Sequence, residues 1–395
     1  IFAQQYSFPY TYTIRLMNNK DSEIIKDIRF PLTFIVVMQH CMGSVYYDFE
    51  WTNLSGSDIY NIIKILLSGS FAAIAVPAFF LISGFLFFNK IEHFDLSVYK
   101  SKLSSRLRTL LVPYILWPVF VVPCAILIII AQIHLGKLPS ETIHNYLSSI
   151  DLNCFFWDHQ RQYTEQVNLF NMQALKTKPF LGTFWFIRDL ILMVLLSPLV
   201  YVFVKKVKGI GIALLTVLFL LRLWPEISLT LSAVYFFTLG AFLSINGRHI
   251  YTSNKATRMF LYAIALVSLC AIVATSNISP FWSYQLEPLY TISGTLAFIN
   301  ITYYIKERRW KIPNHPILSD SSFFVYAFHH DIALPLGFFI AKGIFMGCEE
   351  PFIKTIEYII TPCIIYGICI MAYMIMKRFM PKLLNVLTGS RAKKS

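Results

Sequence analysis

Arg29 and His40 are the residues whose types and spacing point most directly to chemistry, because both fall in one largely apolar segment. They are eleven residues apart, and at about 100° per residue in an α-helix they project within roughly 20° of the same direction. The helical rise separates them by roughly 16 Å along the axis. If Arg29 lies at a membrane surface, His40 lies near mid-depth, where an ionisable residue is expected to be functional.

Both residues also admit a purely structural explanation. Arg29 could reach the lipid headgroups from the start of a first membrane helix, with its aliphatic stem along apolar surface. His40 could form a hydrogen bond that holds two packed helices together. The two residues alone leave both explanations open.

The composition indicates which elements would position these side chains. The chain of 395 residues is 56% hydrophobic and only 14% charged, and its apolar runs exceed what a water-soluble surface could cover. The formal net charge of +13 fits a membrane protein whose Lys and Arg residues gather in cytoplasmic loops, and it requires no nucleic-acid partner. The sequence therefore predicts an integral membrane protein in contact with the lipid bilayer.

Apolar segments of about twenty residues recur along the chain and predict an all-α, polytopic membrane protein with about ten transmembrane helices. Between residues 132 and 183 this pattern stops, which predicts an extracytoplasmic loop. The expected spans cover residues 28–47, 62–88, 110–131, 184–208, 209–223, 229–245, 259–275, 286–305, 322–340 and 353–376.

Segments rich in Lys and Arg fall in every second predicted loop, and this distribution gives the expected orientation in the membrane. Five of them fall on one side of the membrane, which the positive-inside rule makes cytoplasmic, and both termini are then inside. The first residues show no signal-peptide pattern, and Met17 looks like a natural start. We therefore expect an N-terminal extension and cytoplasmic segment (1–26), a transmembrane domain (27–377) and a basic cytoplasmic tail (378–395).

Four stretches place polar or aromatic residues at fixed points of the predicted spans. They are Asp27-Ile28-Arg29 leading to His40, Phe79-Phe80-Leu81-Ile82-Ser83-Gly84-Phe85, Trp185-Phe186-Ile187-Arg188, and Ser322-Phe323-Phe324-Val325-Tyr326-Ala327-Phe328-His329. Together they resemble acyltransferase family 3, a group of membrane-embedded O-acyltransferases that includes bacterial glycan O-acetyltransferases. The resemblance extends from about Ile24 to Lys377, and the Arg-His spacing is its most specific feature.

The resemblance implies that cytoplasmic acyl-coenzyme A is a co-substrate, with no permanently bound cofactor. Arg29, Arg106 and Arg108 would bind its phosphates, because guanidinium groups bind phosphate through paired hydrogen bonds. Basic residues here could instead contact lipid headgroups. The family usually has two arginines three residues apart before a Pro-Tyr pair, whereas position 109 is a threonine and Arg108 would point in another direction.

The resemblance also implies that His40 is catalytic. Its imidazole could take a proton from an acceptor hydroxyl that attacks the thioester, or it could be a nucleophile that carries the acyl group. The sequence does not choose between these routes. The implied acceptor is a cell-surface carbohydrate or its lipid-linked precursor, the implied acyl group is acetyl, and the implied location is a bacterial inner membrane.

Five further residues are expected to lie in or near the site. Ser83 could bond a carbonyl oxygen or simply permit close helix packing. Trp185 fits an aromatic belt at the membrane interface or stacking against a sugar. Arg188 could neutralise a neighbouring charge, while Tyr326 and His329, three residues apart, share a helix face.

The run His329-His330-Asp331 resembles a metal-ligand set only at first sight. Adjacent residues on an α-helix point about 100° apart and cannot easily share one ion, so we predict no metal site. Cys154 and Cys348 fall in predicted loops, where a disulfide would require them to approach each other.

The competing hypothesis is a multi-pass transporter or flippase for a glycan or another anionic substrate. In it, ionisable residues such as Arg29, His40, Arg188 and His329 would line a transport path. Such a protein is expected to have two related halves, and no internal repeat is visible in the sequence.

Overall fold

The computed structural model describes residues 19–150, 155–166, 173–224, 228–308 and 316–389. The protein is 79% helical, and strands β1 (Asp158–Gln166) and β2 (Gln173–Lys178) pair as an antiparallel hairpin. Most of the predicted N-terminal extension lies outside the described residues, as does Cys154, which a disulfide with Cys348 would require.

The expectation of about ten spans is not confirmed. Within the described residues, five continuous helical segments are long and apolar enough to cross a membrane, and the bent pair Gly182–Leu195 and Ser197–Leu220 makes a sixth if it counts as one span. Predicted spans 28–47 and 229–245 coincide with shorter or more charged helices, such as α8 (Leu231–Ile245, 15 residues). The five are Gly56–Phe88, Leu96–His134, Lys255–Thr275, Ser322–Ile344 and Pro351–Phe379. The predicted orientation stays a prediction.

The first helix, α1 (Asn19–His40), begins and ends earlier than the predicted span. Its last turn tightens, with the Cys41 N–H donating to the Met38 carbonyl, and Gly43 then takes a left-handed φ of 58°. Because glycine adopts this conformation without steric cost, the chain turns away there. His40 therefore lies at a helix end, and Arg29 lies near the middle of the helix.

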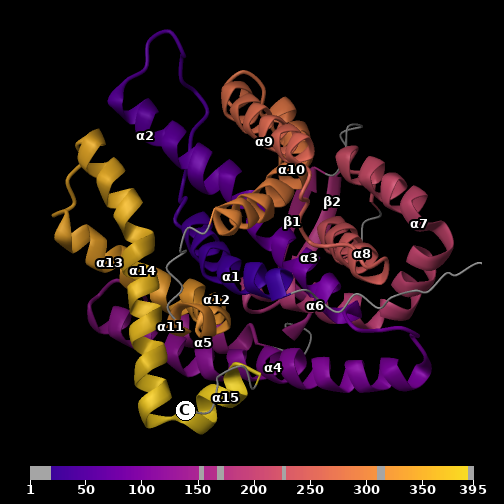
Figure 1. The fold of residues 1–395 in the computed structure, drawn as a ribbon. Coiled ribbons are helices and arrows are strands. Elements are labelled where there is room, and N and C mark those ends of the chain that lie inside the picture. Colours follow the sequence, from indigo (N-terminus) through magenta and orange to yellow (C-terminus); the bar gives the residue numbers. More distant parts are fainter. Residues whose placement is uncertain (1–18, 151–154, 167–172, 225–227, 309–315, 390–395) are drawn as a thin grey trace, which may run out of the picture.

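The second long segment is continuous but irregular. It comprises α2 (Gly56–Lys64), a π-helical turn η1 (Ile65–Ser70), a 3₁₀ turn η2 (Phe71–Ile74) and α3 (Ala75–Phe88). Figure 1 shows α1 and α3 in the middle of the molecule, with the other helices around them. Side chains on these two central helices can therefore contact several of the surrounding helices.

Helices α3 and α8 pack with their backbones in contact. A Cβ atom at Gly84 would lie 2.0 Å from the Phe237 carbonyl oxygen, and one at Gly240 would lie 2.0 Å from the Leu81 carbonyl oxygen. Only glycine fits at either place, as is common where small residues let membrane helices approach. This pair fixes α8 against the central helix.

The remaining helices complete the surrounding layer. The predicted loop at 132–183 contains α5 and the β hairpin, so the all-α expectation missed one small sheet. Helices α6 and α7 meet at a bend of 64°, and Lys208 breaks the helical geometry inside α7. The bounds are α4 (Leu96–His134), α5 (Thr142–Ser148), η4 (Gly182–Phe184), α6 (Trp185–Leu195), α7 (Ser197–Leu220), α9 (Lys255–Thr275), α10 (Pro280–Glu307), α11 (Pro316–Asp320), α12 (Ser322–Phe328), η5 (His329–Ala333), α13 (Leu334–Ile344), α14 (Pro351–Phe379) and α15 (Pro381–Leu387).

Ion pairs attach the N-terminal half of α1 to the segments around it. The Lys306 ammonium lies 2.8 Å from an Asp27 carboxylate oxygen and 3.1 Å from a Glu23 oxygen. The His249 imidazole lies 2.8 Å from an Asp21 oxygen. These contacts fix the start of α1, and with it the direction in which Arg29 and His40 project.

The glycine contact between α3 and α8 can be tested by adding one methyl group. Gly84→Ala is expected to destabilise the protein by about 1–3 kcal/mol or more, because the new atom would overlap backbone rather than a movable side chain. The apparent unfolding midpoint of detergent-purified protein measures this. Gly367→Ala, in α14 with nothing within 4 Å of the added atom, is the matched control and should be neutral or slightly stabilising. Equal midpoints for both variants would contradict the packing.

Candidate active site

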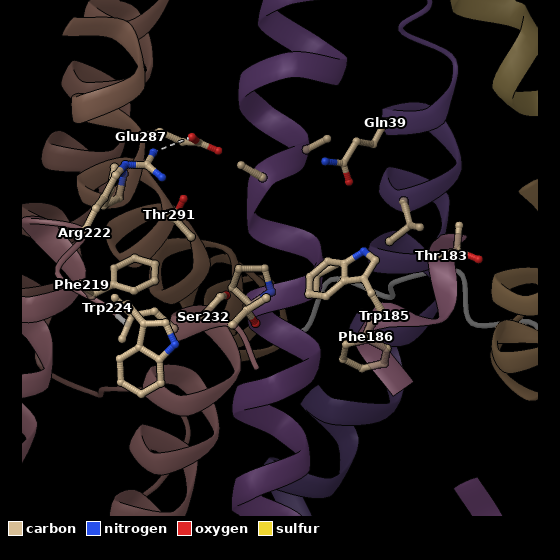
Figure 2. A pocket seen from close by; sticks show the side chains of 18 of the residues that line it. Gln39, Thr183, Trp185, Phe186, Phe219, Arg222, Trp224, Ser232, Glu287 and Thr291 are labelled. Atoms are coloured by element: carbon tan, nitrogen blue, oxygen red, sulfur yellow. Dashed lines mark hydrogen bonds and ion pairs between the residues drawn. The ribbon is translucent and has the colours of Figure 1, made fainter. Parts of the chain in front are cut away.

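His40 lines a cavity of about 500 Å³ that also contacts α3, α6, α7, α8, α10 and α12. This volume falls within the range of roughly 300–1,000 Å³ typical of small-molecule sites. Its floor consists of small residues, Ala72, Ala73 and Val76, from η2 and the start of α3. Figure 2 shows the side chains that converge on this space, with Gln39 and Trp185 toward one end and Arg222 and Glu287 toward the other.

Two further histidines surround the His40 imidazole. Its ring centroid lies 5.1 Å from that of His329 and 4.8 Å from that of His330. The Nδ1 of His330 lies 3.2 Å from an Asp331 carboxylate oxygen. The catalytic residue expected from the sequence is thus the one that meets the cavity, with two imidazoles and a carboxylate behind it.

The rings of the adjacent residues His329 and His330 lie at 79° to each other, and each of them contacts His40. His329–Ala333 form a π-helical turn rather than an α-helical one. A π turn contains one more residue than an α turn and is often found at functional sites. Both rings therefore contact the same partner, His40.

The hydrogen bonds of His329 define which of its nitrogens carries a proton. This fully buried ring places Nδ1 2.8 Å from the Tyr326 carbonyl oxygen and 3.1 Å from that of Val325. A carbonyl oxygen can only accept, so Nδ1 must donate. The Nε2 atom is buried without a hydrogen-bond partner, and in a neutral imidazole it is an acceptor. His329 thus offers a lone pair beside His40.

Tyr326 and Trp185, two of the expected site residues, both line the cavity. The Tyr326 hydroxyl donates a hydrogen bond to the Thr183 carbonyl oxygen, and its ring stacks on Phe184 at 6.0 Å. This anchors the start of α6, where Trp185 begins the helix, against α12. The hydroxyl of Thr183 itself is buried without a partner.

Arg188 does not line the cavity but holds its wall together. Its guanidinium is buried and pairs with Asp189 at 3.1 Å. It also donates to backbone oxygens of three separate segments, at residues 156, 177 and 228. Asp189 in turn accepts from the Thr230 backbone N–H and hydroxyl at the start of α8. Arg188 therefore does more in the structure than neutralise one neighbouring charge.

The other predicted residues lie away from the cavity lining. Arg29 on α1 and Arg108 on α4 are exposed, and Arg106 on α4 is half-buried. None of the three lines the cavity. Thr109, which stands where the family has an arginine, presents its backbone to Gly389, whose added Cβ would lie 2.4 Å from the Thr109 carbonyl oxygen. Ser83 lies beside the glycine contact between α3 and α8. The structure therefore does not bring the three arginines into the cavity with His40.

Two charged residues at the far end of the cavity, Arg222 and Glu287, were not predicted from the sequence. Their side chains form an ion pair of 2.7 Å. Arg222 follows an apolar run, and an ionisable residue beside a predicted membrane helix was a signal that could have identified it. Glu287 lies inside α10.

Among the described residues, no group of three or more His, Cys, Asp or Glu side chains is arranged to hold a metal ion. Although three histidines lie together, they contact one another by ring edges and faces rather than by nitrogens converging on one point. The chemistry that this arrangement offers is proton transfer or nucleophilic attack by an imidazole.

Comparison with known proteins assigns the class. A family profile described as an acyltransferase domain matches residues 27–376. The chain belongs to this acyltransferase family, which confirms the resemblance to acyltransferase family 3. Together with its long apolar helices, this makes it a multi-pass membrane acyltransferase.

The chain is also similar to one curated protein, the succinoglycan biosynthesis protein ExoH of Rhizobium meliloti (strain 1021). The two are 26% identical over 356 residues, which cover 88% of this chain and 87% of ExoH. No solved structure matches the chain significantly.

The Arg188–Asp189 pair gives a test of how the cavity wall is held. Arg188→Ala should destabilise the protein by about 3–5 kcal/mol, because it leaves the buried Asp189 without its counter-charge. The apparent unfolding midpoint in detergent measures this. Lys354→Ala removes an exposed pair with Glu349 and should leave the midpoint nearly unchanged. A similar small effect for both variants would show that the buried network does not stabilise the wall.

Proposed function

We propose that this protein is an O-acyltransferase that moves an acyl group, with acetyl the expected one, from cytoplasmic acyl-coenzyme A to a carbohydrate hydroxyl. The acceptor would be a cell-surface polysaccharide or its lipid-linked precursor. Family membership supports the reaction class, and the similarity to a succinoglycan biosynthesis protein supports a polysaccharide acceptor. The bacterial source of that relative supports placement in a bacterial inner membrane.

The observation that carries the proposal is the position of His40, which meets the cavity while two imidazoles lie behind it. As a general base, His40 takes the proton of the acceptor hydroxyl while the hydroxyl oxygen bonds to the thioester carbonyl carbon. This addition gives a tetrahedral intermediate. When the intermediate collapses, its carbon–sulfur bond breaks, and the leaving thiolate takes the proton from His40. In the second route, His40 attacks the thioester first, releases coenzyme A and passes the acyl group to the hydroxyl.

The unpartnered Nε2 of His329 supports either route. If it accepts a hydrogen bond from one nitrogen of His40, the other nitrogen of His40 keeps its lone pair. A second buried group that selects the tautomer of a catalytic histidine has the same effect as the carboxylate of a catalytic triad. His329 is thus a positioning residue for His40 in this proposal.

The donor would bind with its phosphates at Arg29 and with Arg106 and Arg108 as further cationic groups. Arg29 is exposed and projects from the same helix as His40, roughly 16 Å away by the helical rise. The pantetheine arm would extend along α1 toward the cavity. Because the arginines lie outside the cavity lining, only the thioester end of the donor would enter it.

Replacing His40 tests the catalytic assignment. His40→Ala should lower acyl transfer from radiolabelled acetyl-coenzyme A by at least about 10²-fold, the lower end of what a general acid–base group contributes. His134→Ala, which alters an exposed histidine at the end of α4, is the matched control and should retain activity. Elution and helical content in detergent verify that both variants are folded. Full activity of His40→Ala would remove the central assignment.

Donor binding can be measured without knowledge of the acceptor. Acetyl-coenzyme A should bind the detergent-purified protein saturably and more weakly at high salt, because the contacts are charge pairs. Arg29→Ala should reduce this binding, whereas His40→Ala should keep it. Arg248→Ala, which removes another exposed arginine, is the control. Binding that is insensitive to both salt and Arg29→Ala would exclude Arg29 as the phosphate site.

A further inference from the structure

The cavity continues well beyond His40 to a second set of polar and aromatic residues. Arg222, Trp224, Tyr284 and Glu287, which we call the distal cluster, line it at the end of α7 and along the first half of α10. In Figure 2, Arg222, Trp224 and Glu287 lie on the opposite side of the view from Gln39 and Trp185. Transfer of an acyl group at His40 leaves these residues without an assigned role.

Arg222 is held rigidly in a conformation that ordinary residues avoid. Its φ is 53°, in the left-handed region, where it ends α7 with the N–H of Leu223 bonded to the Leu218 carbonyl. Glycine is the usual residue at this position of a helix end, because a side chain there is strained. Strained residues concentrate at functional sites, which directs attention to the Arg222 side chain.

Neighbouring residues hold the Arg222 guanidinium in place, but not all of its N–H groups have a hydrogen-bond partner. It lies 3.5 Å from the centre of the Tyr284 ring, and its Nη2 donates to the Tyr284 carbonyl oxygen and the Glu287 carboxylate at 2.6 and 2.7 Å. Its Nε atom is buried and has no hydrogen-bond partner. A buried donor without a partner is rare in folded proteins, and here it belongs to a side chain that lines the cavity.

The neighbours of Arg222 determine what such a ligand is. Glu287 uses one carboxylate oxygen for Arg222 and remains 39% exposed, so it can accept further hydrogen bonds. The Trp224 indole N–H donates to the Leu229 carbonyl oxygen, which fixes the ring where it lines the cavity. Thr291 adds a hydroxyl to the lining. The cluster therefore combines a flat apolar surface with paired donors and acceptors.

We propose that the distal cluster binds a sugar residue of the acceptor and thereby sets which hydroxyl reaches His40. The C–H faces of a sugar ring pack on aromatic rings, and its neighbouring hydroxyls can donate to a carboxylate and accept from a guanidinium. A phosphate group fits less well, because Glu287 already neutralises Arg222 and would repel an anion. This inference rests on the proposed acyl transfer to carbohydrate.

Direct binding tests the cluster separately from catalysis. Methyl β-glucoside, methyl β-galactoside and oligosaccharides prepared from succinoglycan are titrated into the full-length, detergent-purified protein, with tryptophan emission as the readout. At least one of these saccharides should bind saturably. Glu287→Gln and Arg222→Lys should weaken that binding at least tenfold, whereas His40→Ala should leave it within twofold of wild type.

Glu307→Gln is the matched control. Glu307 pairs with Arg258 at 3.3 Å, and Arg258 lies 5.2 Å from the centre of the Tyr303 ring, so the same three residue types interact outside the cavity. Wild-type saccharide binding by Glu307→Gln, with loss in Glu287→Gln, supports the proposal. Unchanged binding in Glu287→Gln, or no binding of any saccharide to the wild type, overturns it. Failure of the proposed function would appear separately, as absence of His40-dependent consumption of acetyl-coenzyme A.

Discussion

A buried guanidinium must find its hydrogen-bond partners within the protein, and at Arg188 this constraint determines how the cavity wall is built. Its partners are backbone oxygens from the segment before β1, from β2 and from the segment before α8, together with the carboxylate of Asp189. Asp189 also accepts a hydrogen bond from Thr230, the N-cap residue of α8, which lines the cavity. Segments far apart in the sequence are thus held around one charge.

Small side chains have two effects along the continuous helical segment Gly56–Phe88. Gly84 and its counterpart Gly240 let the backbones of α3 and α8 touch, which closes the bundle. Nearer the start of this helix, Ala72 and Ala73 leave room that the surrounding helices do not fill, and the cavity lies there. Close packing and open space are therefore produced by one pattern of small residues, and larger residues at either level would change the site.

His40, Trp185 and Tyr326 could be proposed from the sequence because each lies in a short pattern with a distinctive residue type; all three line the cavity, and their roles stay predictions. The sequence was sufficient for the family, because the motif residues are spread over most of the chain. The end of α1 was not predicted, because apolar residues continue past His40 and only the backbone at Gly43 turns the chain. Arg222 was missed because its placement depends on a helix end that residue periodicity does not reveal. The predicted number of spans was not confirmed where helices are bent, short or charged, as at α8 and the α6–α7 pair.

The π turn at His329–Ala333 also has a consequence for the helix that follows it. An extra residue in one turn rotates everything beyond it by about 100° relative to a regular helix. Gly337 in α13 faces α14 as a result, at a point where an added Cβ would lie 2.2 Å from the Ile365 side chain. The orientation of the histidines toward His40 and the seating of α13 on α14 are therefore set by the same register. An insertion or deletion in this turn would change both the orientation of the histidines and the packing of α13 on α14. The chemistry of the site and the assembly of the helix bundle therefore depend on the same few residues.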